Sequence, residues 1–161
     1  MGLRIFQADY QNSQHAAYIV ALLDAYARDP MGGGEPLSEF VKQNLIESLS
    51  NIAHAVSVIA TVDGKPAGLI NGFEGFSTFK CKRLLNIHDV TVLPQYRGRQ
   101  ISQKMLEKVE QIARSRNCCK LTLEVLSNNR GAKSVYSKFG FSDYELDPEA
   151  GTALFWQKQL D

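Results

Sequence analysis

The segment Asp89-Val-Thr-Val-Leu-Pro-Gln-Tyr-Arg-Gly-Arg-Gln-Ile-Ser102 is the most informative stretch of the sequence. It places the end of an apolar strand, a short loop with Arg97, Gly98 and Arg99, and the start of a helix in direct succession. Backbone N–H groups at a helix start have no partners within the helix, and the helix dipole adds positive potential there. With two arginines beside it, the segment predicts a site for a phosphate-bearing ligand, with a solvated basic turn as the alternative.

Hydrophobic periodicity on either side of this segment predicts alternating strands and helices. Helical spacing predicts four helices, at residues 13–26, 37–49, 101–112 and 132–139. Apolar or alternating segments predict strands at residues 3–7, 55–62, 65–73, 84–92, 121–125, 141–146 and 153–158. Ser13 is the expected cap of the first helix, and Asp63-Gly64 predicts a hairpin turn. This order is typical of a mixed α/β sheet with helices on its faces, and 161 residues predict a single domain, residues 1–161.

Composition excludes several classes of partner. Lys and Arg total 18 against 17 Asp and Glu, and the net charge of +1 gives no support for a nucleic-acid partner. No apolar run is long enough for a membrane span, so we expect no membrane partner, and the first residues lack the features of a secretory signal. Cys81, Cys118 and Cys119 form no disulfide framework and no zinc pattern. We therefore expect a cytoplasmic protein without a bound metal.

Two blocks of the sequence resemble the GNAT superfamily of N-acetyltransferases. The first is Val92-Leu-Pro94-Gln-Tyr-Arg97-Gly98-Arg-Gln100-Ile-Ser102, where the family reads Val-x-Pro-x-x-Arg-Gly-x-Gly-x-Gly/Ala. The second family block, Asn-x-x-Ala-x-x-x-Tyr-x-x-x-Gly-Phe, is matched by Asn129, Ala132, Tyr136, Gly140 and Phe141. The element order also fits, so the resemblance covers essentially the whole chain. It implies a mixed, mostly antiparallel sheet with a splayed parallel pair and helices on both faces.

The resemblance implies acetyl-CoA as the acetyl donor. Its pyrophosphate would lie on the backbone amides of Arg97, Gly98, Arg99, Gln100, Ile101 and Ser102. Its pantetheine arm would lie along the strand end formed by Val90, Thr91 and Val92, where the family splays two parallel strands apart. From the second block, Asn129 and Ala132 would contact the cofactor, and Tyr136 would approach the sulfur. The family prefers small residues at the positions that Gln100 and Ser102 occupy.

Three residues are candidate catalytic groups. By resemblance, Tyr136 would be the acid that protonates the departing sulfur, although its place in an apolar helical stripe also fits a core tyrosine. Asp89 and Glu124 are carboxylates that could accept the amine proton, and Asp89 is favoured because it is closer in sequence to the inferred acetyl position. His88 and Asp89 are successive residues of one strand, so the pleat predicts that at most one of them faces the acceptor.

The predicted function is transfer of an acetyl group from acetyl-CoA to a primary amine by direct attack, because no motif for a covalent acyl-enzyme is present. The acceptor stays open between small molecules and protein amines. Asp24, Asp29 and Glu35, around a glycine-rich break, either line an amine-binding cleft or form a solvated loop. The alternative function is a non-catalytic module that binds CoA or a protein partner. Dimers are common among the proteins that the chain resembles, so a homodimer is a further option.

Overall fold

We analysed a computed structural model of the chain, which describes residues 2–145 and 147–160. The chain divides into two compact units, Met1–Leu123 and Glu124–Asp161, and each is described by itself. The single domain over residues 1–161 stays a prediction. No helix in the described ranges has the length and apolar character that crossing a membrane requires.

The first unit is built on a five-stranded sheet with the strand order β1-β2-β3-β4-β5. The strands are β1 (Leu3–Gln7), β2 (Ala55–Val62), β3 (Lys65–Ser77), β4 (Lys82–Val92) and β5 (Leu121–Leu123). The first four pair antiparallel, and β4 pairs parallel with β5. This confirms the predicted mixed, mostly antiparallel sheet. The hairpin turn between β2 and β3 is also as predicted, since Asp63 and Gly64 both have positive φ, at 50° and 77°.

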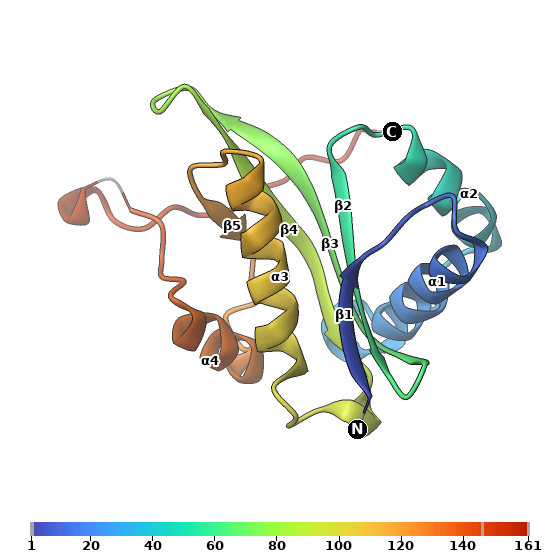
Figure 1. Ribbon diagram of the computed structural model, residues 1–161. Coiled ribbons are helices and arrows are strands. Elements are labelled where there is room, and N and C mark those ends of the chain that lie inside the picture. Colours follow the sequence, from blue (N-terminus) through green and yellow to red (C-terminus); the bar gives the residue numbers. More distant parts are fainter. Residues whose placement is uncertain (1, 146, 161) are drawn as a thin grey trace. The chain divides into compact units, whose positions relative to one another are not determined.

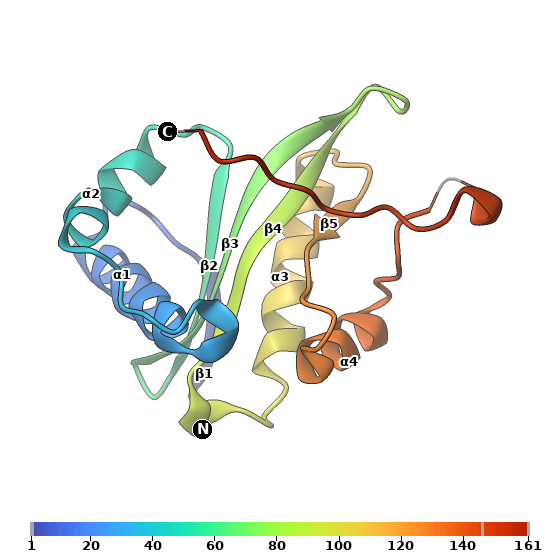
Figure 2. The ribbon, with the colours of Figure 1, turned by 180° about the vertical axis from the view of Figure 1, so that it is seen from behind.

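Helices cover both faces of this sheet, as Figures 1 and 2 show from opposite sides. The helices α1 (Ser13–Arg28) and α2 (Glu39–Ser50) lie on one face, and α3 (Ile101–Ser115) lies on the other. Short 3₁₀ turns, η1 (Pro30–Gly32) and η2 (Pro94–Tyr96), follow α1 and β4. The cap of α1 corrects one prediction: Asn12, not Ser13, accepts the backbone N–H groups of Gln14 and His15.

The hydrophobic core has one part on each face of the sheet. On the α1 face, Ile19 and Leu22 pack with Ile59 and Leu69, all at most 1% exposed. On the opposite face, a Cβ atom built at Gly68 would lie 2.9 Å from Met105 Cε and 3.0 Å from the carbonyl oxygen of Thr91. A side chain at position 68 would meet the backbone of β4 and the end of the Met105 side chain, so the close packing at this point requires glycine.

One irregularity interrupts the pairing of β3 with β4. Asn71 is opposite Asp89, but the next residue, Gly72, is opposite Ile87, so His88 is an extra residue in β4. This is a β-bulge, which locally changes the direction in which side chains project from the strand.

The second unit contains α4 (Arg130–Phe139) and the 3₁₀ turn η3 (Pro148–Ala150). Asn129 caps α4 by accepting the N–H of Ala132, and Gly140, with φ at 110°, ends it as predicted. The aromatic rings of Tyr136 and Phe139 pack against Phe141.

The last strands were not predicted correctly. No strand forms within residues 141–145 or 153–158 among the described residues, and Leu146 lies outside them. The Ala153 N–H donates to the Tyr144 carbonyl, but the two segments form no ladder in the described part of the chain. β5 also ends at Leu123 rather than at residue 125.

Candidate functional site

The site is built around the carboxyl-terminal end of β4. The parallel ladder between β4 and β5 runs from Leu85 opposite Leu121 to Ile87 opposite Leu123, and β4 then continues to Val92. Beyond Ile87, the β5 side of β4 therefore has no partner strand among the described residues. An unpaired strand edge presents backbone N–H and C=O groups that a ligand can bind.

The backbone groups at this edge belong to Val90 and Val92. The N–H of Leu93 donates to the Ala67 carbonyl, toward β3. Backbone groups alternate between the two edges of a strand, so the N–H and C=O of Thr91, two residues earlier, also point toward β3. The carbonyl of Val92 faces the opposite edge, where it accepts a hydrogen bond from Arg97 Nε at 3.0 Å. Thr91 was predicted as a cofactor contact, but its backbone groups belong to the β3 ladder and its side chain is 7% exposed.

The loop after β4 leads to the start of α3 through two residues with left-handed backbone, and this conformation is costly for Gln100 but not for glycine. Gly98 and Gln100 both have positive φ, at 76° and 60°. The first helical bond of α3 runs from Lys104 N–H to the Gln100 carbonyl at 3.2 Å, and Gln100 supplies no side-chain cap. The amides of Ile101 and Ser102 precede that bond, so the helix offers them no acceptor. The side chain of Ile101 is buried in the core at 2% exposure, which holds this helix start in place.

Arg97 has a different role from the one predicted. Its backbone N–H donates to the Pro94 carbonyl at 3.3 Å, so it is not one of the amides available to a pyrophosphate. Its guanidinium bonds the Val92 carbonyl and Asp29 Oδ2, the latter at 3.2 Å. Arg97 thus connects the end of β4 to the turn after α1. Arg99 instead places its guanidinium over the ring of Tyr96, 5.6 Å from the centroid.

The bulge corrects the expectation that His88 and Asp89 face opposite sides of the sheet. Asp89 Oδ2 accepts a hydrogen bond from Asn71 Nδ2 at 3.1 Å, and His88 packs edge-on against Phe73 with ring centroids 5.1 Å apart. Asn71 and Phe73 lie two residues apart on β3 and therefore share a face. Both His88 and Asp89 consequently project toward the α1 face.

Burial dominates the electrostatics of Asp89. Removal of water raises the pKa of the Asp89 carboxyl above its usual range, while the Asn71 hydrogen bond and the charge of His88 oppose this rise. Tyr26 of α1 faces the same carboxylate. Burial raises the pKa of the Tyr26 phenol, and the charges of Asp89 and Asp29 raise it further. A carboxyl with a raised pKa beside an open strand edge is suited to accept a proton from a bound ligand.

The remaining predicted site residues lie in the second unit. Asn129 uses its side-chain oxygen to cap α4, with Ala132 as the donor. Tyr136 is partly buried and its ring packs edge-on against Phe141 at 5.9 Å. Glu124 was predicted within a strand, but it follows the end of β5 and is exposed.

Asp24, in the last turns of α1, and Asp29, just after it, are both engaged by neighbouring groups. Asp24 accepts the N–H of Leu37 and pairs with Arg28 and Lys42. The hydrogen bond from Leu37 is the main reason why the pKa of Asp24 is low. Asp29 caps η1 by accepting the N–H of Met31, which lowers its pKa, with Arg97 adding to the effect. Both carboxylates stabilise the loop between α1 and α2, so we do not assign them to amine binding.

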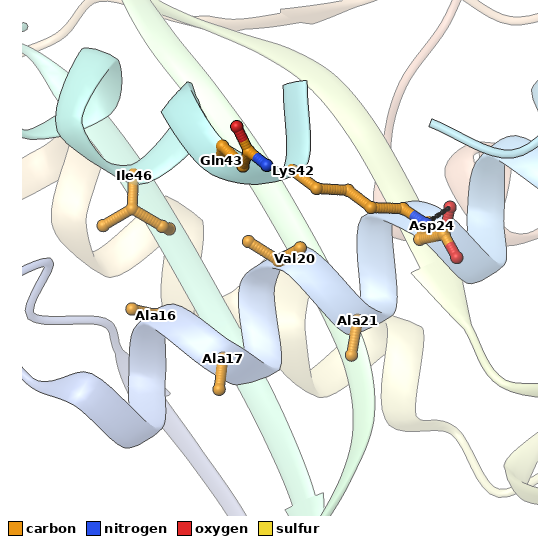
Figure 3. A pocket seen from close by; sticks show the side chains of 8 residues that line it. All are labelled: Ala16, Ala17, Val20, Ala21, Asp24, Lys42, Gln43 and Ile46. Carbon is orange, nitrogen blue, oxygen red and sulfur yellow. Dashed lines mark ion pairs between the residues drawn. The ribbon is translucent and has the colours of Figure 1, made fainter. Parts of the chain in front are cut away.

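A groove of about 510 Å³ lies between α1 and α2 (Figure 3). Its walls are mostly apolar, including Ala17, Val20 and Ile46, and the ion pair between Lys42 and Asp24 spans one part of it. Of the residues predicted for amine binding, Asp24 lines this groove, and none of the predicted catalytic or cofactor-binding residues does. Within the described ranges, no group of three or more His, Cys, Asp and Glu side chains is arranged to hold a metal ion.

Three polar residues near Asp89 were missed in the sequence. Tyr10, Ser57 and Asn71 form a hydrogen-bonded chain that ends at Asp89. Asn71 carries the one signal that could have been read, because it is a polar residue within the apolar run Leu69-Ile-Asn-Gly-Phe73. Ser57 and Tyr10 carry no such signal, since serine and tyrosine are common in strands and loops.

Comparison with known proteins identifies one family. Residues 19–141 match the sequence model described as "Acetyltransferase (GNAT) family". Thialysine N-epsilon-acetyltransferase of Bos taurus is 32% identical over 93 residues, which are 55% of this chain and 54% of the bovine protein. The match therefore spans about half the length of this curated relative.

Solved structures of low sequence identity share the fold. The aminoglycoside acetyltransferase HMB0005, from an uncultured soil metagenomic sample, has a TM-score of 0.79 at 17% identity, with 100% of both chains covered. AAC(6')-Iy, in complex with the bisubstrate analogue CoA-S-monomethyl-acetylneamine, has a TM-score of 0.75 at 19% identity, with 99% of this chain and 100% of that chain covered.

Replacing Gln100 by glycine should stabilise the protein. A left-handed conformation costs an L-residue roughly 1–2 kcal/mol, and the larger unfolded-state entropy of glycine offsets about 0.5–1 kcal/mol of the gain. We expect Gln100→Gly to raise the free energy of unfolding in urea by up to about 1 kcal/mol. Lys104→Gly, at an exposed helical position of α3, should lower it by about 1 kcal/mol. A loss of stability in Gln100→Gly would contradict the observed conformation.

Replacing Asp89 by asparagine should stabilise the protein at neutral pH. The folded-state pKa of Asp89 is raised, so ionisation of Asp89 opposes folding, and the parent loses stability as pH rises through that pKa. Asp89→Asn has no such loss and can still accept the Asn71 hydrogen bond. Urea titrations should show the variant more stable than the parent at about pH 7, with the difference shrinking as pH falls toward about 3.9, the unfolded-state value. Glu107→Gln removes an exposed charge from α3 as the control; a difference for Asp89→Asn that does not change with pH would contradict the assignment.

Proposed function

The chain belongs to the acetyltransferase (GNAT) family, and we propose that it transfers an acetyl group from acetyl-CoA to a primary amine by direct attack. The observation that carries the proposal is the position of Asp89. Its largely buried carboxylate is adjacent in β4 to Val90, the first residue whose backbone faces the open edge beyond the β5 ladder. A proton acceptor and a backbone donor thus meet at one point of the strand.

The residues at this end of β4 fit acetyl-CoA. The start of α3 offers amide groups without helical acceptors, at Ile101 and Ser102, and these would hold the pyrophosphate. At the open edge, the Val90 carbonyl and the Val92 N–H would hold the amides of the pantetheine arm in the manner of a strand. When bound, acetyl-CoA supplies an acyl carbon activated as a thioester.

Asp89 would take the proton that the amine nitrogen loses. An alkylammonium with a pKa near 10.4 and an ordinary carboxylic acid near 3.9 differ by about 6.5 pH units, or roughly 9 kcal/mol. Asp89 therefore does not deprotonate the ammonium outright. The neutral amine attacks, and the nitrogen becomes acidic as its bond to the acyl carbon forms, so the proton can then pass to Asp89 directly or through water. Burial raises the pKa of Asp89 and so improves it as the acceptor.

The backbone N–H of Val90 would bind the acyl oxygen while it carries negative charge. Val90 shares the open edge with Val92, and its N–H is held in a fixed direction by the sheet on the other side of β4. A preorganised donor of this kind stabilises developing charge without reorganisation.

Tyr136 would donate a proton to the departing sulfur as the carbon–sulfur bond breaks. The support for this role is the second family block, in which Tyr136 occupies the tyrosine position. Proton transfer from a phenol with a pKa near 10 to a thiolate with a pKa near 8.5 is uphill by about 2 kcal/mol, so the site must also raise the sulfur pKa by excluding water. Exchange with solvent then restores the protons of Tyr136 and Asp89.

A small-molecule primary amine is the acceptor class that the relatives favour. One relative is named for thialysine, and the fold neighbours include acetyltransferases named for aminoglycosides. Both compound classes present unhindered primary amines. The names of these proteins support the class of acceptor and select no single compound.

Thiol release from acetyl-CoA in the presence of thialysine or neamine tests the activity. We expect turnover by the parent and a loss of about 10²–10⁴-fold in kcat for Asp89→Asn, because a positioned base contributes that much. CoA should raise the melting temperature of both proteins equally. Glu124→Gln is the control carboxylate. A melting shift with no turnover for any amine would favour the non-catalytic binding module, and full loss in Glu124→Gln with none in Asp89→Asn would move the base to Glu124.

Tyr136→Phe tests the acid. The substitution keeps the ring that packs against Phe141 and removes only the hydroxyl. We expect kcat to fall by about 10²–10⁴-fold, with little change in the melting temperature or in its shift by CoA. Phe139→Leu, which alters the same aromatic cluster without touching Tyr136, is the packing control. A Tyr136→Phe enzyme within about threefold of the parent would make Tyr136 a core residue.

A further inference from the structure

A chain of three side-chain hydrogen bonds crosses the α1 face of the sheet and ends at Asp89. Tyr10 Oη lies 2.9 Å from Ser57 Oγ. Ser57 Oγ lies 2.6 Å from Asn71 Oδ1, and Asn71 Nδ2 lies 3.1 Å from Asp89 Oδ2. These residues come from the loop after β1 and from β2, β3 and β4, so the chain connects successive parts of the sheet.

The chemistry of the groups sets the direction of every bond. An ionised carboxylate only accepts, so Asn71 must present its NH₂ group to Asp89. This leaves Asn71 Oδ1 facing Ser57, whose hydroxyl must then donate. The single proton of Ser57 is used in that bond, so Tyr10 donates to Ser57. All three donors therefore point along the chain toward Asp89.

The interior of the chain is closed to water. Ser57 is 1% exposed and Asn71 is 3% exposed, so no solvent molecule can replace either partner. Their strand neighbours Ile59 and Leu69 are fully buried apolar side chains in the core. Apolar residues at positions 57 and 71 would fit this core without the desolvation cost of polar groups. The polar pair therefore calls for an explanation outside core packing, and its one charged contact is Asp89.

We propose that Asn71 is a positioning residue for the acetyl transfer, holding one oxygen of ionised Asp89 while the other oxygen meets the acceptor amine. Ser57 and Tyr10 fix the orientation of the Asn71 amide. The inference rests on the proposed function, because it assigns Asn71 a role only through Asp89. The Asn71 amide cannot pass a proton along as a hydroxyl would, so the chain orients Asp89 and does not carry protons away from it.

The groups around Asp89 define the expected pH effect. Asn71 of β3 and His88 of β4 favour the ionised form of the Asp89 carboxyl, and burial opposes it. The Tyr26 phenol of α1 interacts with the charges of both Asp89 and Asp29. Without the Asn71 donor, burial is opposed only by His88 among the groups of the first unit. The carboxyl should then keep its proton to higher pH.

The test uses full-length protein with Asn71→Leu, which keeps the approximate size but removes the donor, and Ser57→Ala, which releases the amide. Asn86→Leu is the matched control, because Asn86 is another strand asparagine that donates to a side chain, Thr122 Oγ1 at 2.8 Å, away from Asp89. The first readout is the titration midpoint of the Asp89 carboxyl carbon by NMR, assigned with Asp89→Asn. The second is the pH profile of kcat/KM with acetyl-CoA and thialysine or neamine, whichever the parent accepts.

We expect Asn71→Leu to raise the Asp89 midpoint and to move the acid limb of kcat/KM to higher pH in parallel, with about a tenfold loss near neutral pH. This is smaller than the 10²–10⁴-fold loss expected when the base itself is removed. Ser57→Ala should shift both readouts in the same direction by less, and Asn86→Leu should shift neither.

An unchanged Asp89 midpoint in folded Asn71→Leu overturns the inference, and if that variant does not fold, an unchanged midpoint in Ser57→Ala does so. The NMR readout is independent of turnover. A raised midpoint together with an Asp89→Asn enzyme of full activity would instead remove Asp89 from the reaction. The proposed role of Asp89 as base would then be wrong, although the effect of Asn71 on the Asp89 carboxyl would be confirmed.

Discussion

Antiparallel strands stay in register only while each contributes one residue to every pair, and β4 breaks this rule at His88. The extra residue turns His88 and Asp89 toward the same face, whereas a regular pleat would send them apart. The placement of His88 and Asp89 together on the α1 face depends on this one insertion. Without it, either Asp89 would lose Asn71 or the apolar alternation of β4 beyond Asp89 would be inverted, because a shift of one residue exchanges the two faces of a strand.

The second constraint is the early end of the parallel ladder. β5 pairs with β4 only as far as Leu123, and the unpaired part of β4 leads directly into the loop that starts α3. One continuous segment therefore carries the backbone groups of the open strand edge, at Val90 and Val92, and the N–H groups of the helix start, at Ile101 and Ser102. Arg97 holds this segment by bonding the last carbonyl of the strand and Asp29 beyond α1. An exposed ion pair of this type contributes little to stability, so its effect is to fix the geometry of the loop.

The sequence predicted the elements of the first unit well, because each has a strong period and a clear terminator. The strand at residues 55–62, the turn at Asp63-Gly64 and the helix from Ile101 rest on local signals. Local signals also led to the end of β4 as the candidate site. Features set by partners elsewhere in the chain were missed. The bulge at His88 depends on the residues opposite it in β3, and the engagement of Arg97 with Asp29 joins positions far apart in sequence. The strands expected at 141–146 and 153–158 failed for the same reason, since alternation shows that a segment can pair but not that a partner is present.

The polar chain beneath Asp89 bears on how a largely desolvated carboxyl can be held in its ionised form. Burial alone would make Asp89 a better proton acceptor but would also keep it protonated, and a protonated carboxyl accepts nothing from an amine. The Asn71 amide donates to the carboxylate and offsets part of the desolvation, and Ser57 and Tyr10 hold that amide in place. Exposure would achieve ionisation more simply, yet it would return the carboxyl to its ordinary, weakly basic state. A largely desolvated carboxylate held by the buried Asn71 amide meets both requirements, and it accounts for polar side chains at positions 57 and 71, where β2 and β3 otherwise bury apolar ones.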